Sequence, residues 1–182
     1  SDGQYVQDTT DIIDFLEDRH PDFSVYPETP LQRLVALLLE LYGDEWLMIP
    51  AMHYRWSMLD QQHDFVMSEF GRLSVPEASI EEQIATGERV SKPFSAMLPN
   101  LGITEHTIPG IELTYLAFLD QLDQHFAQFD FLLGSRPSIG DYGLMGPLYA
   151  HLGRAPVPKA LMQKRAPNVY AWVERMNGPM PL

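Results

Sequence analysis

The sequence of 182 residues contains no cysteine. The protein therefore has no thiolate nucleophile, no disulfide bond and no cysteine-based metal site. A small domain that depends on disulfides is excluded, and the length suits one domain with a sizeable core, or one domain plus a fragment of another. The absence of cysteine also agrees with a reducing compartment, so we expect the protein in the cytoplasm.

Basic side chains are scarce as well. Lys and Arg number 12 against 25 Asp and Glu, which gives a net charge of −13. A charge of this sign and size repels phosphate backbones and anionic membrane surfaces, so we expect no nucleic-acid partner. No apolar run approaches the ~20 residues that a membrane helix needs, and we expect no membrane partner.

The start of the chain, SDGQYVQDTTD, lacks both the basic region and the apolar core of a secretory signal. It also lacks an initiator Met and opens on Asp2-Gly3, a turn dipeptide that normally lies between strands. We interpret the sequence as a fragment of a soluble protein.

A metal site is not expected either. The six histidines show no H-x-x-x-H or H-x-x-E spacing; they are His20, His53, His63, His106, His125 and His151.

The first 28 residues are predicted to contain a short strand, a helix and a linker. QYVQ has room for one short strand, and DTTDIIDFLED predicts a helix with Asp8 or Thr9 as N-cap. The buried side of that helix is predicted to consist of Ile12, Ile13, Phe15 and Leu16. Residues 21–28, PDFSVYPE, carry two prolines and no periodicity, which indicates an extended linker and a domain boundary.

From residue 29 onward the sequence shows helical periodicity and no strand-like alternation. Thr29-Pro30 is typical of a helix start, and the helix that follows is predicted to be strongly buried through Leu31, Leu34, Val35, Leu38, Leu39 and Leu41. Gly43 and Pro50 favour either a kink in this helix or a break into two, and both alternatives remain open. The clearest amphipathic helix runs from Ile108 to Phe129, and the tail divides into two helices at Pro167.

The segment FLLGSRPSIGDYGLMGPLY places a Ser three residues ahead of an Asp at the start of an apolar helix. This spacing predicts a capping box, in which Ser138 is the N-cap and the Asp141 carboxylate accepts from the Ser138 N–H. The functional alternative makes Ser138 a nucleophile or Asp141 a general acid. No His lies within the same turn, and the cap explains both residue types, so we favour the structural role.

That segment is similar to the part of cytosolic glutathione transferases where a Ser/Thr-x-x-Asp box caps a central buried helix of the all-helical C-terminal domain. YVQDTTDIIDFLE resembles the end of that family's thioredoxin-like N-terminal domain, and RAPNVYAWVERM resembles its late helix. The resemblance implies an all-α bundle like that C-terminal domain. Residues 1–20 would be a strand-helix remnant of the thioredoxin-like domain, 21–28 the linker and 29–182 the helical domain.

The resemblance also implies a site for glutathione as co-substrate. Asp8 falls on the family's acidic position and Thr9 on its Ser, where the γ-glutamyl end of glutathione binds. A helix N-terminus attracts a carboxylate and a nearby Asp suits an ammonium, although the same two residues are equally suited to capping the helix alone. The family's thiol-activating Tyr, Ser or Cys and its cis-proline loop belong to a preceding segment, so the catalytic residue is unknown, and Tyr5 does not replace it.

A small-molecule electrophile is the other implied ligand. The run GDEWLMIPAMHYRW is rich in aromatic and Met side chains, which suit a wall for an apolar ligand; the candidates are Trp46, Met48, Met52, Tyr54 and Trp56. At this spacing such residues more often belong to a core, and Tyr54 would place a hydroxyl at a pocket rim. Family members are usually dimers with their first long helices near the interface, so we expect a homodimer.

Two other functions remain open. A non-catalytic protein can keep this fold as an interaction module, and a stand-alone helical domain can bind apolar ligands without glutathione.

Overall fold

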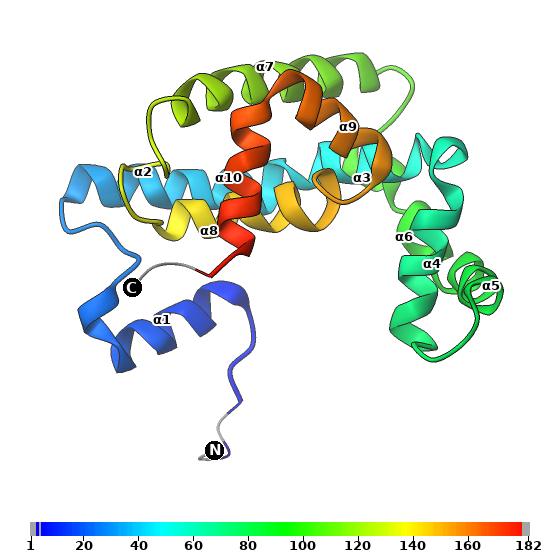
Figure 1. The fold of residues 1–182 in the computed structure, drawn as a ribbon, viewed down its shortest axis with the longest axis horizontal. Coiled ribbons are helices and arrows are strands. Elements are labelled where there is room, and N and C mark those ends of the chain that lie inside the picture. The colour runs from blue at the N-terminus through cyan, green and yellow to red at the C-terminus, as the bar shows by residue number, and fades with distance from the viewer. Residues whose placement is uncertain (1–2, 4, 180–182) are drawn as a thin grey trace.

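The computed structural model describes residues 3 and 5–179, which form a bundle of helices (Figure 1). The helices are α1 (Thr9–Arg19), α2 (Pro30–Leu41), α3 (Met48–Trp56), α4 (His63–Ser74), α5 (Ile80–Val90), α6 (Lys92–Ser95), α7 (Ile108–Phe126), α8 (Ile139–Pro147), α9 (Pro156–Arg165) and α10 (Pro167–Asn177). Short helical turns connect them: η1 (Pro21–Phe23), η2 (Tyr42–Trp46), η3 (Leu59–Gln61), η4 (Leu98–Leu101) and η5 (Leu148–Leu152). The all-α fold predicted from the sequence is confirmed.

The short strand predicted ahead of α1 is not formed in the described residues. Residues 5–7 are irregular, while Asp2 of the predicted turn and Gln4 of the predicted strand lie outside the described residues. A strand satisfies its backbone groups by pairing with a neighbour. Across residues 3 and 5–179 the β pairing consists of one isolated bridge between Phe131 and Gly134, so residues 5–7 have no ladder to join.

Helix α1 is present as predicted, but the burial predicted for its apolar side is wrong. Ile12 and Leu16 are 41% and 48% exposed, and α1 has no fully buried residue. The helix is held through the linker instead, because the Glu17 carboxylate accepts from the Val25 N–H at 2.8 Å. The Tyr26 hydroxyl adds a bond of 2.6 Å to Asp14 on the same helix.

The first long helix of the bundle is kinked rather than broken. Helix α2 passes into α3 through the π-helical turn η2, where the Leu47 N–H donates to the Tyr42 carbonyl over 3.1 Å. Pro50 lies in the first turn of α3, directly after this π turn, and its missing N–H favours a kink at this point of the helix. Figure 1 shows α2 and α3 following one another along the length of the bundle. Of the two alternatives left open by the sequence, the kinked helix is the one observed.

The strong burial predicted for α2 is also wrong. Within α2 only Ala36 is fully buried, whereas Leu31, Leu34 and Leu38 are 72%, 55% and 56% exposed. The reason is that α8 packs very closely against α2: a Cβ added to Gly143 of α8 would lie 2.5 Å from the Cα of Glu40. Backbone-to-backbone approach of this kind buries a narrow strip of α2 and leaves its leucine stripe on the outside.

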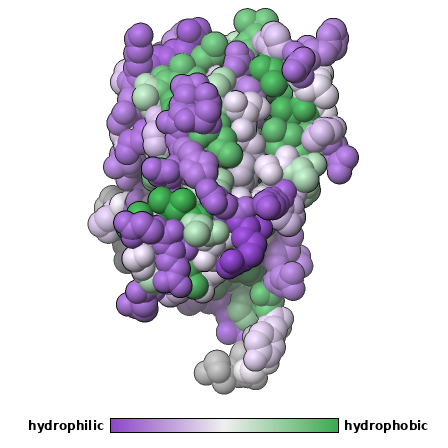
Figure 2. Space-filling view, turned by 90° about the vertical axis from the view of Figure 1, so that its right-hand side faces the viewer, coloured by the Kyte–Doolittle hydropathy of each residue, from purple (hydrophilic) through white to green (hydrophobic). Residues whose placement is uncertain are grey.

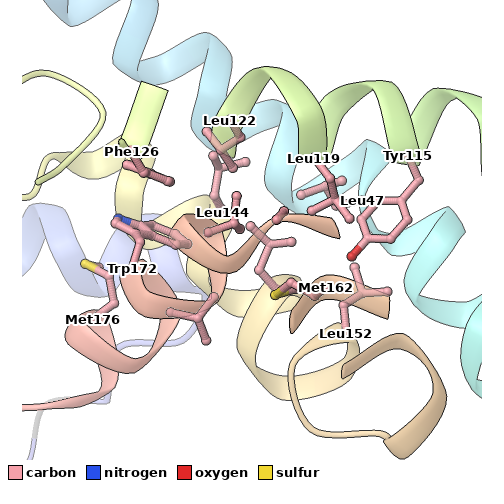
Figure 3. Close-up of a cluster of buried hydrophobic side chains, with 14 of the residues drawn as sticks. Leu47, Tyr115, Leu119, Leu122, Phe126, Leu144, Leu152, Met162, Trp172 and Met176 are labelled. Carbon is pink, nitrogen blue, oxygen red and sulfur yellow. The ribbon is translucent and has the colours of Figure 1, made fainter. Parts of the chain in front are cut away.

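Helices α7 to α10 and the α3 segment enclose the main core (Figure 3). Tyr115, Leu119, Leu122 and Phe126 of α7 are buried, as the amphipathic pattern predicted. The ring of Trp172 on α10 stacks on Phe126 with centroids 4.9 Å apart. The division of the tail at Pro167 into α9 and α10 is confirmed.

Helices α4 and α5 form a hairpin at one end of the bundle, over a second and smaller core. They approach through glycine, since a Cβ on Gly87 would lie 2.0 Å from the Met67 carbonyl oxygen. Figure 2 faces this end and shows mostly hydrophilic side chains with hydrophobic ones scattered between them.

Candidate functional site

The N-terminus of α1 has an unusual backbone. Asp8, its N-cap, adopts φ 78° and ψ 138°, and among the described non-glycine residues it alone has a positive φ. Side chains with a Cβ rarely adopt this conformation, and such strain is concentrated at ligand sites. The Asp8 carboxylate accepts from the Thr10 N–H at 3.0 Å, so the capping role predicted from the sequence is present. The backbone N–H of Thr9 is left without an intrahelical acceptor.

Carboxylates gather around this helix end. The Thr10 hydroxyl donates to Glu40 Oε1 over 2.9 Å, which ties α1 to the last turn of α2. Asp44 lies in the same region: burial raises its pKa, and the negative charges of Glu40, Glu45 and Asp8 raise it further. Glu40 and Asp44 were not predicted from the sequence, although two acids four residues apart at the end of an apolar helix are a usable signal.

The arrangement offers complementary groups to an α-amino acid moiety. Asp8, Glu40 and Asp44 would attract an ammonium, and the α1 N-terminus would attract a carboxylate. Thr9 is exposed, and in the described part of the chain its hydroxyl has no hydrogen-bond partner. An exposed hydroxyl at a helix N-terminus adds one more donor for the carboxylate.

The predicted pair Ser138 and Asp141 forms a capping box at the start of α8. Asp141 Oδ2 accepts from the Ser138 N–H at 2.8 Å and from its hydroxyl at 2.9 Å. Asp141 Oδ1 accepts from the Leu132 N–H at 3.0 Å and from Trp172 Nε1 at 3.1 Å. Both side chains are buried, so this network holds three segments of the bundle together and offers no surface to a substrate.

The five residues considered for an electrophile pocket are separated in the structure. Trp46, 60% exposed, borders a shallow apolar hollow of about 680 Å³ between η2, the start of α3 and α7. Met48 lies at the surface, whereas Met52 and Trp56 are buried in the second core. Tyr54 is buried in the main core rather than at a rim.

The interior beside this hollow contains polar groups. Burial, together with the negative charge of Glu112, raises the pKa of Tyr54 to about 12. Its ring lies 5.5 Å from that of Tyr115, whose hydroxyl points into the core in Figure 3. His53 is fully buried, with Nε2 at 3.1 Å from Glu112 Oε1. The pair of His53 and Glu112 was not predicted from the sequence, because a lone His among apolar residues is ordinarily a core residue.

The described chain sets further limits on the kind of site. No helix there is both long enough and apolar enough to span a bilayer. Nor do three or more His, Asp or Glu side chains of residues 3 and 5–179 group closely enough to hold a metal ion.

The fold and its capped central helix define a structural class. The protein is an all-α bundle in which a Ser-x-x-Asp box begins a buried helix. Residues 105–175, from just before α7 into α10, match the family of the glutathione S-transferase C-terminal domain. This match agrees with the resemblance found in the sequence. A search of curated proteins finds no match, and neither does a search of solved structures.

Proposed function

We propose that the protein is a glutathione transferase-like protein that conjugates glutathione to an electrophilic small molecule, or uses glutathione on it. The observation that carries this proposal is the strained N-terminus of α1 among three carboxylates, next to a bundle with this family's C-terminal domain sequence. Residues 1–20 would be the end of a thioredoxin-like domain, 21–28 the linker and 29–182 the helical domain.

In this proposal, the residues around the α1 N-terminus bind the γ-glutamyl group of glutathione. The γ-glutamyl ammonium would lie against Asp8 and Glu40, and its carboxylate would accept from the backbone N–H and hydroxyl of Thr9. The electrophile would lie against the apolar hollow at Trp46. The group that lowers the pKa of the glutathione thiol lies, in this proposal, outside the 182 residues. The thiolate sulfur would form the new bond to the electrophilic carbon, either displacing a leaving group that departs with its electron pair or adding to a polarised double bond whose electron pair then takes up a proton from water.

The exposed apolar side of α1 supports the proposed domain division. Ile12 and Leu16 project from the helix and are about half exposed in this chain. A helix with such a side is normally covered by a sheet or by other helices. The body of a thioredoxin-like domain would provide that cover.

The leucine stripe of α2 supports a homodimer. Leu31, Leu34, Val35, Leu38 and Leu41 follow one another at spacings of three, one, three and three, and all are exposed. An apolar stripe of this length on a protein of net charge −13 is typical of an interface. A two-fold axis would place one stripe against the other.

A non-catalytic interaction module is the second candidate, and the same stripe favours it. Such a protein needs the helical fold and an exposed apolar surface but no glutathione. The two candidates therefore differ in whether glutathione binds.

Calorimetric titration of the full-length protein with glutathione separates them. We expect wild type to bind, and Thr9→Ala to weaken binding severalfold because a hydroxyl donor to the carboxylate is lost. Thr29→Ala is the matched control, since it also removes a threonine hydroxyl at a helix N-terminus, that of α2. No binding by any of the three folded proteins would exclude the site and favour the interaction module.

A further inference from the structure

A cleft at the far end of the bundle from α1 is lined by arginines. It lies between α3, α4 and η5, on the side of the α4–α5 hairpin in Figure 1. Arg55, Arg72 and Arg154 line it together with Glu69 and His151. Nothing proposed above for glutathione or the electrophile uses these residues.

The charges in the cleft do not balance. Glu69 Oε1 accepts from Arg72 Nη2 at 3.0 Å, and Glu69 Oε2 pairs with Arg154. The single carboxylate of Glu69 thus forms ion pairs with two guanidinium groups. The Arg55 side chain donates to the carbonyl of Ala150 at 3.0 Å, and no carboxylate of the described chain lies within ion-pair distance of it.

The surroundings of Arg55 make this charge costly. Burial, reinforced by the positive charge of Arg154 and opposed in part by the negative charge of Glu69, lowers the pKa of Arg55 to about 10, so the group is still charged at neutral pH. The neighbouring His151 is neutral there, because burial and the charge of Arg55 lower its pKa to about 4. The lining therefore has three positive charges and one negative charge, in a protein whose net charge is −13.

The remaining lining of the cleft is apolar, and the volume of the cleft is small. Phe65, Phe70 and Leu73 of α4 form one wall. The volume is about 210 Å³, below the ~300–1,000 Å³ typical of drug-sized sites, so the occupant has to be small. A guanidinium beside aromatic rings matches a planar carboxylate that carries an apolar body.

We propose that this cleft binds a small organic carboxylate, with the Arg55 guanidinium holding the carboxylate and the Phe65 and Phe70 rings contacting the apolar body. Arg72 and Arg154 supply a positive field, since Glu69 neutralises only one of them. The site is independent of glutathione, because it lies at the opposite end of the bundle from α1.

Titration of the full-length protein with benzoate, followed by calorimetry and by amide chemical shifts, tests the proposal. We expect saturable binding that shifts the amides of Ala150 and His151 and is unchanged by glutathione. Benzyl alcohol keeps the ring but lacks the charge, and it should bind about tenfold more weakly or worse. Inorganic phosphate and acetate lack the apolar body and should also bind more weakly than benzoate.

Variants locate the site. Arg55→Gln should weaken benzoate binding about tenfold or more, because the charge-assisted hydrogen bonds are lost. Arg72→Gln removes a half-exposed charge without disturbing the interior and should weaken binding severalfold, which serves if Arg55→Gln does not fold. Arg165→Gln, whose guanidinium is paired with Asp120 elsewhere, is the control and should change nothing.

Three results of the ligand titrations would overturn the proposal. They are the absence of saturable benzoate binding, equal binding of benzoate and benzyl alcohol, and binding of phosphate as strong as that of benzoate. An unchanged affinity in both Arg55→Gln and Arg72→Gln would also overturn it, since benzoate would then be bound elsewhere.

Discussion

The indole N–H of Trp172 donates a hydrogen bond of 3.1 Å to Oδ1 of Asp141, which joins the last helix to the N-terminus of the buried helix α8. Asp141 has no exposed surface, and its two oxygens also accept from the backbone N–H groups of Leu132 and Ser138. One carboxylate therefore connects α8, α10 and the turn that precedes α8. This makes Asp141 the polar centre of the bundle.

Replacing this carboxylate should strongly destabilise the fold. Asp141→Ala leaves the N–H groups of Leu132, Ser138 and Trp172 buried without a partner, and at ~1–3 kcal/mol for each the loss should be at least about 3 kcal/mol. Urea unfolding measures it. Trp172→Phe is the control: it removes one donor, keeps a ring against Phe126, and should cost clearly less. Equal losses in the two variants would contradict the role assigned to Asp141.

The close contact between α2 and α8 predicts opposite effects for two glycines of α8. Gly143→Ala places a methyl group 2.5 Å from the Cα of Glu40, and overpacking of this kind should cost about 1–3 kcal/mol. A Cβ on Gly146 meets no atom within 4 Å, so Gly146→Ala should stabilise the helix by about 0.5–1 kcal/mol. Thermal unfolding of both variants tests this. A neutral Gly143→Ala would show that the helices are farther apart.

The buried His151 predicts a dependence of stability on pH. The pKa of His151 is about 4 in the folded protein, against an ordinary value of 6.5 for histidine. Between these pH values the unfolded state therefore binds the proton and the folded state does not. Stability should therefore fall as the pH drops from about 6.5 to 4, by about 2–3 kcal/mol from this group, with no further loss from it below pH 4.

Unfolding free energies at several pH values isolate this contribution. His151→Gln should lose less stability than wild type over the same range, because the buried base is gone. His20→Gln replaces an exposed histidine at the C-terminal end of α1 and should follow wild type. Parallel curves for His151→Gln and wild type would disprove the assignment.

The α2 stripe predicts the oligomeric state. We expect the wild-type protein to sediment as a dimer, and the double variant Leu34→Glu, Leu38→Glu to sediment as a monomer, because charges would face each other across the interface. Leu113→Glu changes an exposed leucine on α7 and should remain dimeric. A monomeric wild type would refute this interface.

Much of the fold could be predicted because helix signals are local. The N-cap at Asp8, the box at Ser138 and Asp141 and the break at Pro167 each depend on residues within one turn, and all are found in the structure. Burial was predicted less well. The leucines of α2 have the same spacing whether they face a core or a partner, so periodicity alone could not show that they are exposed.

The candidate site was only partly predictable for the same reason. Asp8 and Thr9 adjoin in sequence, but Glu40 is brought next to them by the hydrogen bond that it accepts from the Thr10 hydroxyl, 30 positions away. The run from Trp46 to Trp56 suggested one wall, whereas the π turn and the helix that follows direct Met52 and Trp56 into one core and Tyr54 into another. Contacts between distant segments decide these outcomes, and they have no local signal.

Comparison of glutathione with cysteinylglycine tests the central claim most directly, because the dipeptide lacks the γ-glutamyl group that Asp8, Thr9 and Glu40 are proposed to bind and carries a free amino group on its cysteine instead. Calorimetry on the full-length protein should show glutathione binding and a dipeptide affinity about tenfold weaker or worse. Equal affinities, or no binding of glutathione to the folded protein, would contradict the account.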